Sequence, residues 1–410
     1  MNCLSRRTVL VNGLACLGAA CLPKVTLAAS IPSPIEATAI TEVFGHGERL
    51  VGIAIQYAED LCSPSLSLTD FLVEGRTVTN VITSASADPS AAAPTGNYVL
   101  VMLDPEDNGA SLYSTSGRDV KITPAEATVT ASGIEIATSK VNRLIVDDFK
   151  QLTFVDDQNN ISLMYNLFVP RDYDPSRSYP LINFMHDASV TSSDHDRTLI
   201  QGLGAVVWAH PEEQAKRPCI ILAPQFDVKV VNDGNQATGH VDTVKRLIEK
   251  LATRYNIDMD RLYTTGQSGG GMLSIAMNIK YPEFFAASFL VACQWGAELV
   301  EPMKDDRLFI VVSAEDQKAY PGQNAITQAL EGFGATVNRA TWNGRWTATE
   351  FNRAYKAMRA ENAQINYVVL EEGTVIPEGA DTGGAAGHMN TWPIAYTIEG
   401  VREWLFEQSR

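Results

Sequence analysis

The sequence predicts an α/β domain built on a mostly parallel sheet and preceded by a smaller all-β domain. Short apolar alternations separated by turn residues occupy residues 35–145. Strands that alternate with helix-patterned segments follow over residues 150–410. This change of pattern indicates two architectures in one chain, and 410 residues are enough to bury at least one large core.

The first domain is expected to be a β-sandwich. Its clearest strand patterns lie at residues 50–55, 77–82 and 98–103, and proline-rich or small-residue loops lie at 84–95 and 104–109. Regularly spaced short strands with turn signals between them are typical of such sandwiches.

The second domain has the strand and helix alternation of a parallel sheet covered on both faces. Ligands in such sheets bind beyond the carboxyl ends of the strands. We expect strands at residues 162–170, 179–186, 219–224, 261–265, 285–292, 307–313 and 366–370, and helices at 241–255, 269–280, 351–362 and 396–407.

Residues 1–30 are interpreted as an export signal. Paired arginines at positions 6–7 precede an uncharged stretch at 9–22, which is too short to span a bilayer comfortably. The pair resembles a twin-arginine signal, which predicts a periplasmic or secreted protein. Cys16 and Cys21 leave a lipoprotein anchor as the less favoured alternative, and no other run is long enough to cross a membrane.

Composition excludes several classes of partner and site. A net charge of −16 disfavours nucleic acid and anionic membranes. Beyond the signal, the cysteines are Cys62, Cys219 and Cys293, an odd and scattered set that predicts neither a disulfide framework nor a metal site. The acidic run at residues 194–196 is interpreted as a solvated loop, and no metal or organic cofactor is expected.

The motif Gly266-Gln267-Ser268-Gly269-Gly270 lies between a predicted strand and a predicted helix. A chain that turns sharply there exposes the serine hydroxyl and needs glycine two residues to either side. The start of the following helix favours developing negative charge. Ser268 is therefore the predicted nucleophile of a serine hydrolase with the α/β-hydrolase fold.

The base and the acid follow from chain order, which in this fold runs serine, acid, histidine. His388 is the only histidine after Ser268, in a loop rich in Gly and Ala between the last strand and the last helix. Asp316 comes just after the strand at 307–313 and is the predicted acid, with Glu315 as the alternative.

An oxyanion hole requires two backbone N–H donors. One is expected from Gly269, directly after the nucleophile, and the other from Asp187 or Ala188, after the strand that ends at His186. His186 is a candidate for substrate binding, although a histidine there more often supports the loop.

Trp295 and Trp392 are candidate walls of the substrate pocket, because each lies close in sequence to a strand end or to the predicted base. Packing in the core is an equally good interpretation of each tryptophan.

These residues resemble secreted α/β-hydrolase esterases of the polyhydroxybutyrate-depolymerase and feruloyl-esterase type, in particular two-domain esterases with an N-terminal immunoglobulin-like domain. The resemblance covers residues 160–410 and rests on the stretches 165–170, 179–182 and 260–271 and on His388 followed by Trp392. It implies hydrolysis of short-chain or aromatic-acid esters, or of a polymeric ester, by Ser268, Asp316 and His388. Asp187 departs from the glycine usual there, which affects the expected substrate scope.

Two other functions remain open at the level of sequence. A peptidase of the prolyl-peptidase type could use the same triad, with the β-domain controlling access. A binding protein with a vestigial triad could use the immunoglobulin-like domain to hold a polymer or a partner. Fold-level analogy does not identify the substrate.

Overall fold

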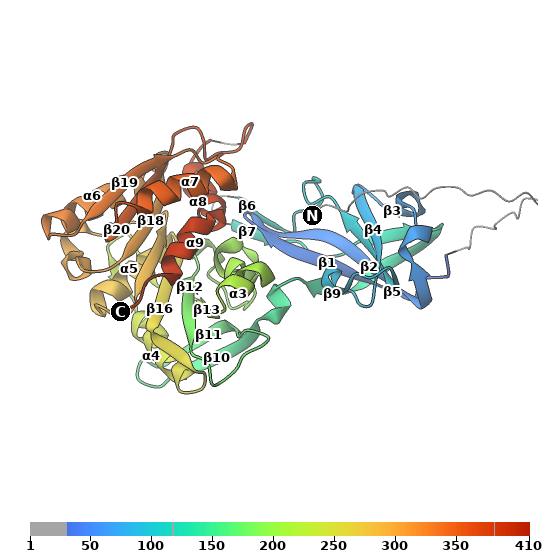
Figure 1. Cartoon of the computed structure of the whole chain (residues 1–410), viewed down its shortest axis with the longest axis horizontal. Helices are drawn as coiled ribbons and strands as arrows, with labels where there is room; N and C mark the ends of the chain where they lie inside the picture. The colour runs from blue at the N-terminus through green and yellow to red at the C-terminus, as the bar shows by residue number, and fades with distance from the viewer. Residues whose placement is uncertain (1–30, 117–118, 381) are drawn as a thin grey trace, which may run out of the picture.

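The computed structural model describes residues 31–116, 119–380 and 382–410. Figure 1 shows an all-β N-terminal domain lying beside a larger α/β domain. The export signal predicted for residues 1–30 lies outside the described residues.

The N-terminal domain is one seven-stranded sheet whose two edge strands, β3 and β4, contact each other. The sheet therefore curls around its own core, which includes Ile53, Val101 and Val129. The strand order is β3 (Phe71–Val73), β8 (Thr128–Ala131), β9 (Ile134–Arg143), β1 (Glu36–Phe44), β2 (Gly47–Cys62), β5 (Thr95–Leu103) and β4 (Val78–Ser84). The pairs are antiparallel except β1 with β9, which is parallel. Short 3-10 helices connect these strands or lead out of the domain: η1 (Ser63–Ser65), η2 (Leu68–Asp70), η3 (Pro89–Ala91) and η4 (Val146–Asp148).

A separate hairpin leaves this sheet and lies at the junction of the two domains (Figure 1). It consists of β6 (Tyr113–Ser116) and β7 (Asp119–Ile122). Tyr113, Val43 and Phe149 pack in the same apolar cluster as Val190 and Trp208 of the α/β domain. One continuous core therefore joins the two domains.

The α/β domain is built on a nine-stranded sheet in which β10 and β11 are antiparallel to their neighbours and the other pairs are parallel. The order is β10 (Lys150–Asp156), β11 (Ile161–Phe168), β13 (Ile220–Gln225), β12 (Tyr179–Met185), β16 (Ile257–Gln267), β17 (Ala287–Val291), β18 (Leu308–Ser313), β20 (Ile365–Leu370) and β19 (Val337–Trp342). β14 (Val231–Asn232) and β15 (Gln236–Ala237) form a small hairpin beside it. The sequence analysis did not predict β19, because Asn338 and Arg339 interrupt its apolar pattern.

Alternate residues of the central strands point to opposite faces, as the period of two requires. Ile182 and Phe184 of β12 enter one core, whereas Leu181 and Met185 enter the other. The first face is covered by α1 (Arg197–Ile200), α2 (Leu203–Val206), α7 (Ala348–Arg359), α8 (Ala386–Thr397) and α9 (Glu399–Phe406). The second is covered by α4 (His240–Ala252), α5 (Gly269–Lys280) and α6 (Ala319–Gly332).

The C-terminal helix prediction needs correction. One helix was expected at residues 396–407, but two helices, α8 and α9, meet at Ile398. The Gly- and Ala-rich composition before His388 hid the start of α8. The short α3 (Pro211–Lys216) and the 3-10 turns η5 (Ala188–Val190), η6 (Val207–Ala209), η7 (Ala297–Leu299) and η8 (Glu301–Met303) complete the domain.

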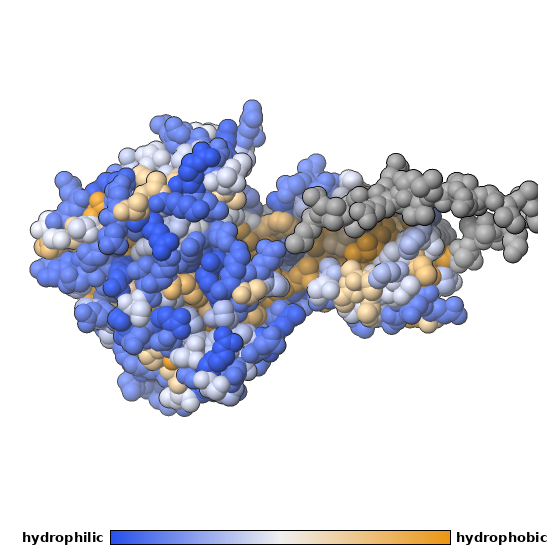
Figure 2. All heavy atoms as spheres, viewed as in Figure 1, coloured by the Kyte–Doolittle hydropathy of each residue, from blue (hydrophilic) through white to orange (hydrophobic). Residues whose placement is uncertain are grey.

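Figure 2 shows a mainly hydrophilic surface over the α/β domain and more hydrophobic residues over the N-terminal domain. Within the described ranges, no helix is both long enough and apolar enough to cross a membrane.

Candidate active site

Ser268 lies in the sharp turn between β16 and α5, with φ 52° and ψ −118°. This is a strained conformation for a residue with a side chain. A Cβ added at Gly270 would lie 1.9 Å from the Met185 carbonyl oxygen, and one added at Gly266 would lie 2.4 Å from the Gly270 carbonyl carbon. Both glycines are therefore required by close backbone approach, and the N-terminus of α5 begins directly at the serine.

Three side chains from the carboxyl ends of different strands meet at this turn. Ser268 follows β16, Asp316 follows β18, and His388 comes after β20. The His388 Nε2 atom is 2.9 Å from the Ser268 Oγ atom, and the His388 Nδ1 atom is 2.5 Å from an Asp316 carboxylate oxygen. The geometry is that of a nucleophile, a general base and an orienting acid.

Asp316 is buried and is held by more than its contact with His388. Its other carboxylate oxygen accepts hydrogen bonds from the backbone N–H groups of Ala319, at 2.9 Å, and Lys318, at 3.1 Å. Burial by itself raises the pKa of Asp316, but the hydrogen bonds and charge of His388 and the two N–H groups outweigh it, so the pKa lies below its usual value. The carboxylate is thus ionised at neutral pH.

Glu315, the alternative acid, does not reach His388. Its Cβ atom would lie 2.6 Å from a Cβ added at Gly387, so its backbone packs under the start of α8. One of its carboxylate oxygens is buried without a hydrogen-bond partner among the described residues.

His388 was expected in a loop, but it lies in the first turn of α8. A helix fixes the imidazole more firmly than a flexible loop would. The Trp392 ring packs edge-on against the imidazole one turn later, with 5.4 Å between ring centroids. Trp392 therefore lies beside the candidate base, as its place in the sequence predicted.

The loop after β12 lies beside the nucleophile, and we call residues 187–196 the oxyanion loop. A Cβ added at Gly269 would lie 3.4 Å from the Ala188 backbone nitrogen, so these two predicted donors are neighbours. The buried Asp187 carboxylate accepts hydrogen bonds from Ser189, within the loop, and from Gln267 Nε2 at 3.2 Å. The carboxylate at the position where glycine was expected thus has hydrogen-bond donors inside the protein.

His186 supports this loop from inside the protein. Its Nε2 atom accepts a hydrogen bond from the Phe226 N–H at 2.9 Å, and its Nδ1–H donates to the Asp187 carbonyl oxygen at 2.6 Å. Burial lowers the pKa of His186 against the opposing influence of Asp187, which keeps the ring neutral. A ring so enclosed does not face a substrate, which corrects its candidacy for substrate binding.

Trp295 is also buried, in the apolar cluster that contains Met303 and Ala319. Trp295 therefore packs in the core, which was the alternative interpretation of this residue.

Sequence reasoning missed two contacts of the site. Gln267 is inside the motif, yet nothing in the pentapeptide indicates that its side chain binds Asp187. Tyr113 of the β6–β7 hairpin packs in the same apolar cluster as Val190 of the oxyanion loop. No sequence signal could find Tyr113, since it belongs to the other domain.

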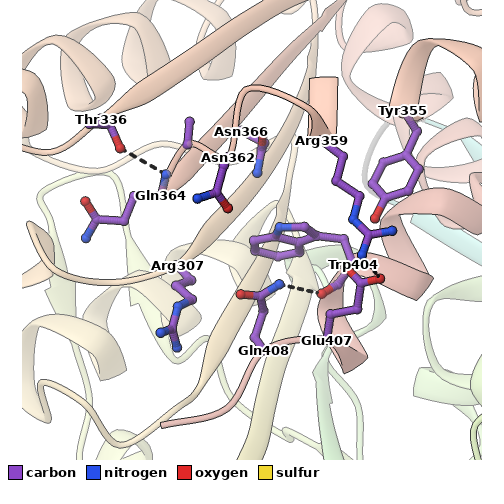
Figure 3. Close-up of a pocket in the computed structure, with 11 residues that line it drawn as sticks. Arg307, Thr336, Tyr355, Arg359, Asn362, Gln364, Asn366, Trp404, Glu407 and Gln408 are labelled. Carbon is purple, nitrogen blue, oxygen red and sulfur yellow. Dashed lines mark hydrogen bonds and ion pairs between the residues drawn. The ribbon is translucent and has the colours of Figure 1, made fainter. Parts of the chain in front are cut away.

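A cavity of about 510 Å³ lies at the amino ends of β18 and β20, whereas the candidate site lies at the carboxyl ends of the strands (Figure 3). Arg307, before β18, and Asn366, at the start of β20, line it, together with Trp404. In the described part of the chain, no group of three His, Cys, Asp or Glu side chains could hold a metal ion.

The comparisons with known proteins agree with this architecture. Residues 36–160 match the family described as the esterase Ig-like N-terminal domain. The crystal structure of a thermostable esterase is similar over 92% of this chain and 100% of its own, with 26% identity and a TM-score of 0.77. No curated protein sequence matches the chain.

More distant likenesses were found to a feruloyl esterase module from Clostridium thermocellum and to an acetyl xylan esterase from Aspergillus awamori. The first has 13% identity and a TM-score of 0.41 over 62% of this chain and 88% of its own. The second has 16% identity and a TM-score of 0.35 over 46% of this chain and 82% of its own.

The fold, the meeting of Ser268 with His388, and the full-length likeness to the thermostable esterase lead to one conclusion. The chain is a carboxylic ester hydrolase with an α/β-hydrolase domain, and its residues 36–160 match the esterase Ig-like N-terminal domain.

Proposed function

We propose that the protein hydrolyses short-chain or aromatic-acid esters through a Ser268–His388–Asp316 triad and an acyl-enzyme. The observation that carries the proposal is the unbroken hydrogen-bond chain from Asp316 through His388 to Ser268. The positive φ of Ser268 and the start of α5 behind it support the same assignment.

In the first half-reaction, His388 Nε2 takes the proton of Ser268 as the serine oxygen attacks the ester carbonyl carbon. Asp316 holds the imidazole and stabilises its charged form. The backbone N–H groups of Gly269 and of Ala188 or Asp187 stabilise the oxyanion. The tetrahedral intermediate collapses, and the alcohol leaves with the proton from His388.

In the second half-reaction, His388 takes a proton from water as the water oxygen attacks the acyl carbon. The acyl–oxygen bond to Ser268 breaks, the acid is released, and the serine regains its proton from His388. Every proton passes through His388, so the cycle ends with the enzyme in its starting state.

The test is turnover of p-nitrophenyl acetate by the wild type and by Ser268→Ala, which should lose at least about 10³-fold in kcat. Ser176→Ala, at an exposed serine in the loop before β12, is the matched control and should keep wild-type rates. Comparable turnover by Ser268→Ala and the wild type would contradict the assignment.

The class of substrate needs a second measurement. A panel of acetyl, butyryl and feruloyl esters, with an aminoacyl-naphthylamide beside naphthyl acetate, separates an esterase from a peptidase. A fluorophosphonate probe that fails to label Ser268 in the wild type would instead favour a vestigial triad and a binding role.

We also propose that the protein is exported by a twin-arginine signal, which rests on the arginine pair at positions 6–7. The double variant Arg6→Lys, Arg7→Lys should leave the protein in the cytoplasm of a bacterial host. Its appearance in the periplasm at the wild-type level would contradict the proposal.

A further inference from the structure

A small hairpin lies beside the turn that carries the nucleophile. It consists of β14 and β15 and follows β13 in the chain. A Cβ added at Gly269 would lie 3.7 Å from the Val231 Cγ2 atom, and β14 contacts α5, the helix that begins at Gly269. Val231, whose side chain is only partly buried, therefore lies against the residue that supplies one of the predicted oxyanion donors.

Side chains from the other side of the nucleophile bind the tip of this hairpin. Asp233, in the turn, forms an ion pair with Lys318 at 2.9 Å and accepts a hydrogen bond from Gln294 Nε2 at 3.3 Å. Gln294 follows β17, and Lys318 follows β18 shortly after the candidate acid Asp316. The hairpin is therefore attached to the loops after two strands other than the one that leads into it.

The strand order shows which way the hairpin runs. In the sheet, β12 and β16 lie between β13, which leads into the hairpin, and β17 and β18, whose following residues bind its tip. The hairpin must therefore cross the carboxyl ends of β12 and β16. Because Ser268 directly follows β16, the hairpin forms a wall beside the nucleophile.

Hydrogen bonds within the hairpin fix the shape of this wall. The Thr238 N–H donates to the Val230 carbonyl oxygen at 2.9 Å and closes the base of the hairpin. The Asn232 Oδ1 atom accepts from the Gln236 N–H at 3.3 Å, and the Asn232 Nδ2 atom donates to the Gln236 side chain at 3.0 Å. Val231 lies between these two sets of bonds, so its backbone is held on both sides.

The chemistry of the proposed reaction places the two halves of an ester on different sides of Ser268. The alcohol oxygen takes its proton from His388, so the alcohol must lie within reach of that imidazole. His388 is on α8, which packs on the first face of the sheet. Val231 packs with the core of the second face, which α5 covers. The substrate group that meets Val231 is therefore the acyl group.

We propose that Val231 is a specificity-determining residue that limits the length of the acyl group. The inference rests on the proposed function and deepens it, since it assigns one wall of the acyl site to the β14–β15 hairpin. The Val231 methyl groups occupy the space beside Gly269 into which a longer acyl chain would extend.

The experiment compares kcat/KM for the p-nitrophenyl esters of acetate, butyrate and hexanoate, in which only the acyl group changes. Val231→Ala removes two methyl groups and should raise the hexanoate-to-acetate ratio of kcat/KM by about 10-fold, the effect expected when an apolar site gains room for one methylene. Val231→Phe extends further into the same space and should lower this ratio by a similar factor.

Val228→Ala is the matched control, because Val228 lies in the same loop between β13 and β14 but its side chain is 47% exposed. Its hexanoate-to-acetate ratio should stay within about 2-fold of wild type. A second comparison keeps the acetyl group and changes the alcohol, from p-nitrophenyl acetate to naphthyl acetate. Val231→Ala should change the ratio of kcat/KM for these two esters by less than about 2-fold.

The outcomes separate this inference from the assignment of the triad. A hexanoate-to-acetate ratio within about 2-fold of wild type in Val231→Ala, or one shifted in the same direction by both Val231 variants, would overturn the role of Val231 while the triad stands. A larger change in the alcohol comparison than in the acyl series would also overturn it, because the wall would then face the leaving group. If Ser268→Ala keeps turnover, the proposed function fails first. Should Val231→Phe fail to fold, Val231→Ala alone decides.

Discussion

The His388 Nδ1 atom lies 2.5 Å from an Asp316 carboxylate oxygen, although 72 residues separate them in the chain. Asp316 reaches this point from the end of β18, and His388 reaches it from the first turn of α8. The helix α8 packs against β18, so the element that carries His388 is held beside the strand that ends just before Asp316.

Asp316→Asn should lower kcat by about 10⁴-fold, because an amide cannot hold the imidazole in the required tautomer or stabilise its charged form. Steady-state hydrolysis of p-nitrophenyl acetate checks this. The control is Glu315→Gln, next to Asp316 but without a contact with His388, and it should stay within a few-fold of wild type. A larger loss in Glu315→Gln than in Asp316→Asn would contradict the assignment of the acid.

Gly270→Ala should destabilise the fold by about 3 kcal/mol or more, because its Cβ would overlap the Met185 carbonyl oxygen at 1.9 Å. The matched control is Gly332→Ala at the end of α6, where an added Cβ meets nothing within 4 Å. That variant should be neutral or more stable by about 0.5 kcal/mol. Urea unfolding curves measure both, and equal stability of the two variants would show that β12 and α5 are less closely apposed.

Glu213→Gln should destabilise the α/β domain by about 3–5 kcal/mol, since it removes the charge between two partly buried guanidinium groups. The Glu213 carboxylate pairs with Arg217 and, at 2.9 Å, with Arg402. Burial lowers the pKa of Arg402 to about 10, which reflects the cost of holding this cation inside. Glu212→Gln, at the exposed neighbour on α3, should change the unfolding free energy by less than about 0.5 kcal/mol.

Asp306→Asn should make the protein less sensitive to rising pH. Burial, with the charges of Asp305 and Glu283, raises the pKa of Asp306 to about 8, and one of its carboxylate oxygens is buried without a partner among the described residues. The folded state therefore binds this proton more tightly than the unfolded chain. Its contribution to stability is fully present below about pH 4 and is lost as the pH rises through about 8.

The measurement is the free energy of unfolding of wild type and Asp306→Asn at pH 5 and pH 8. The variant should gain about 1 kcal/mol relative to wild type between these values, because the half-buried carboxyl is partly screened by solvent. Asp305→Asn, at an exposed neighbour, should keep most of the wild-type pH dependence, because burial is a larger cause of the raised pKa of Asp306 than the Asp305 charge. Parallel pH profiles for Asp306→Asn and the wild type would contradict the raised pKa.

Much of the architecture could be predicted from local patterns. Apolar strands of the central sheet such as 179–186 and 307–313 are recognisable, because a strand buried on both faces has a continuous apolar sequence. Edge strands are not, since β19 alternates exposed and buried residues and contains Asn338 and Arg339. The start of α8 was missed because glycine and alanine carry no amphipathic pattern.

The sequence by itself determined which residues could form the triad. A serine in a glycine turn before a helix, a single histidine downstream and an aspartate at a strand end are all local features, and chain order relates them. The tertiary structure alone decided where Asp187 directs its carboxylate and that Tyr113 of the other domain packs with Val190 of the oxyanion loop. Such contacts depend on how two separately patterned domains pack, and packing between residues 77 positions apart leaves no periodic signal in either segment.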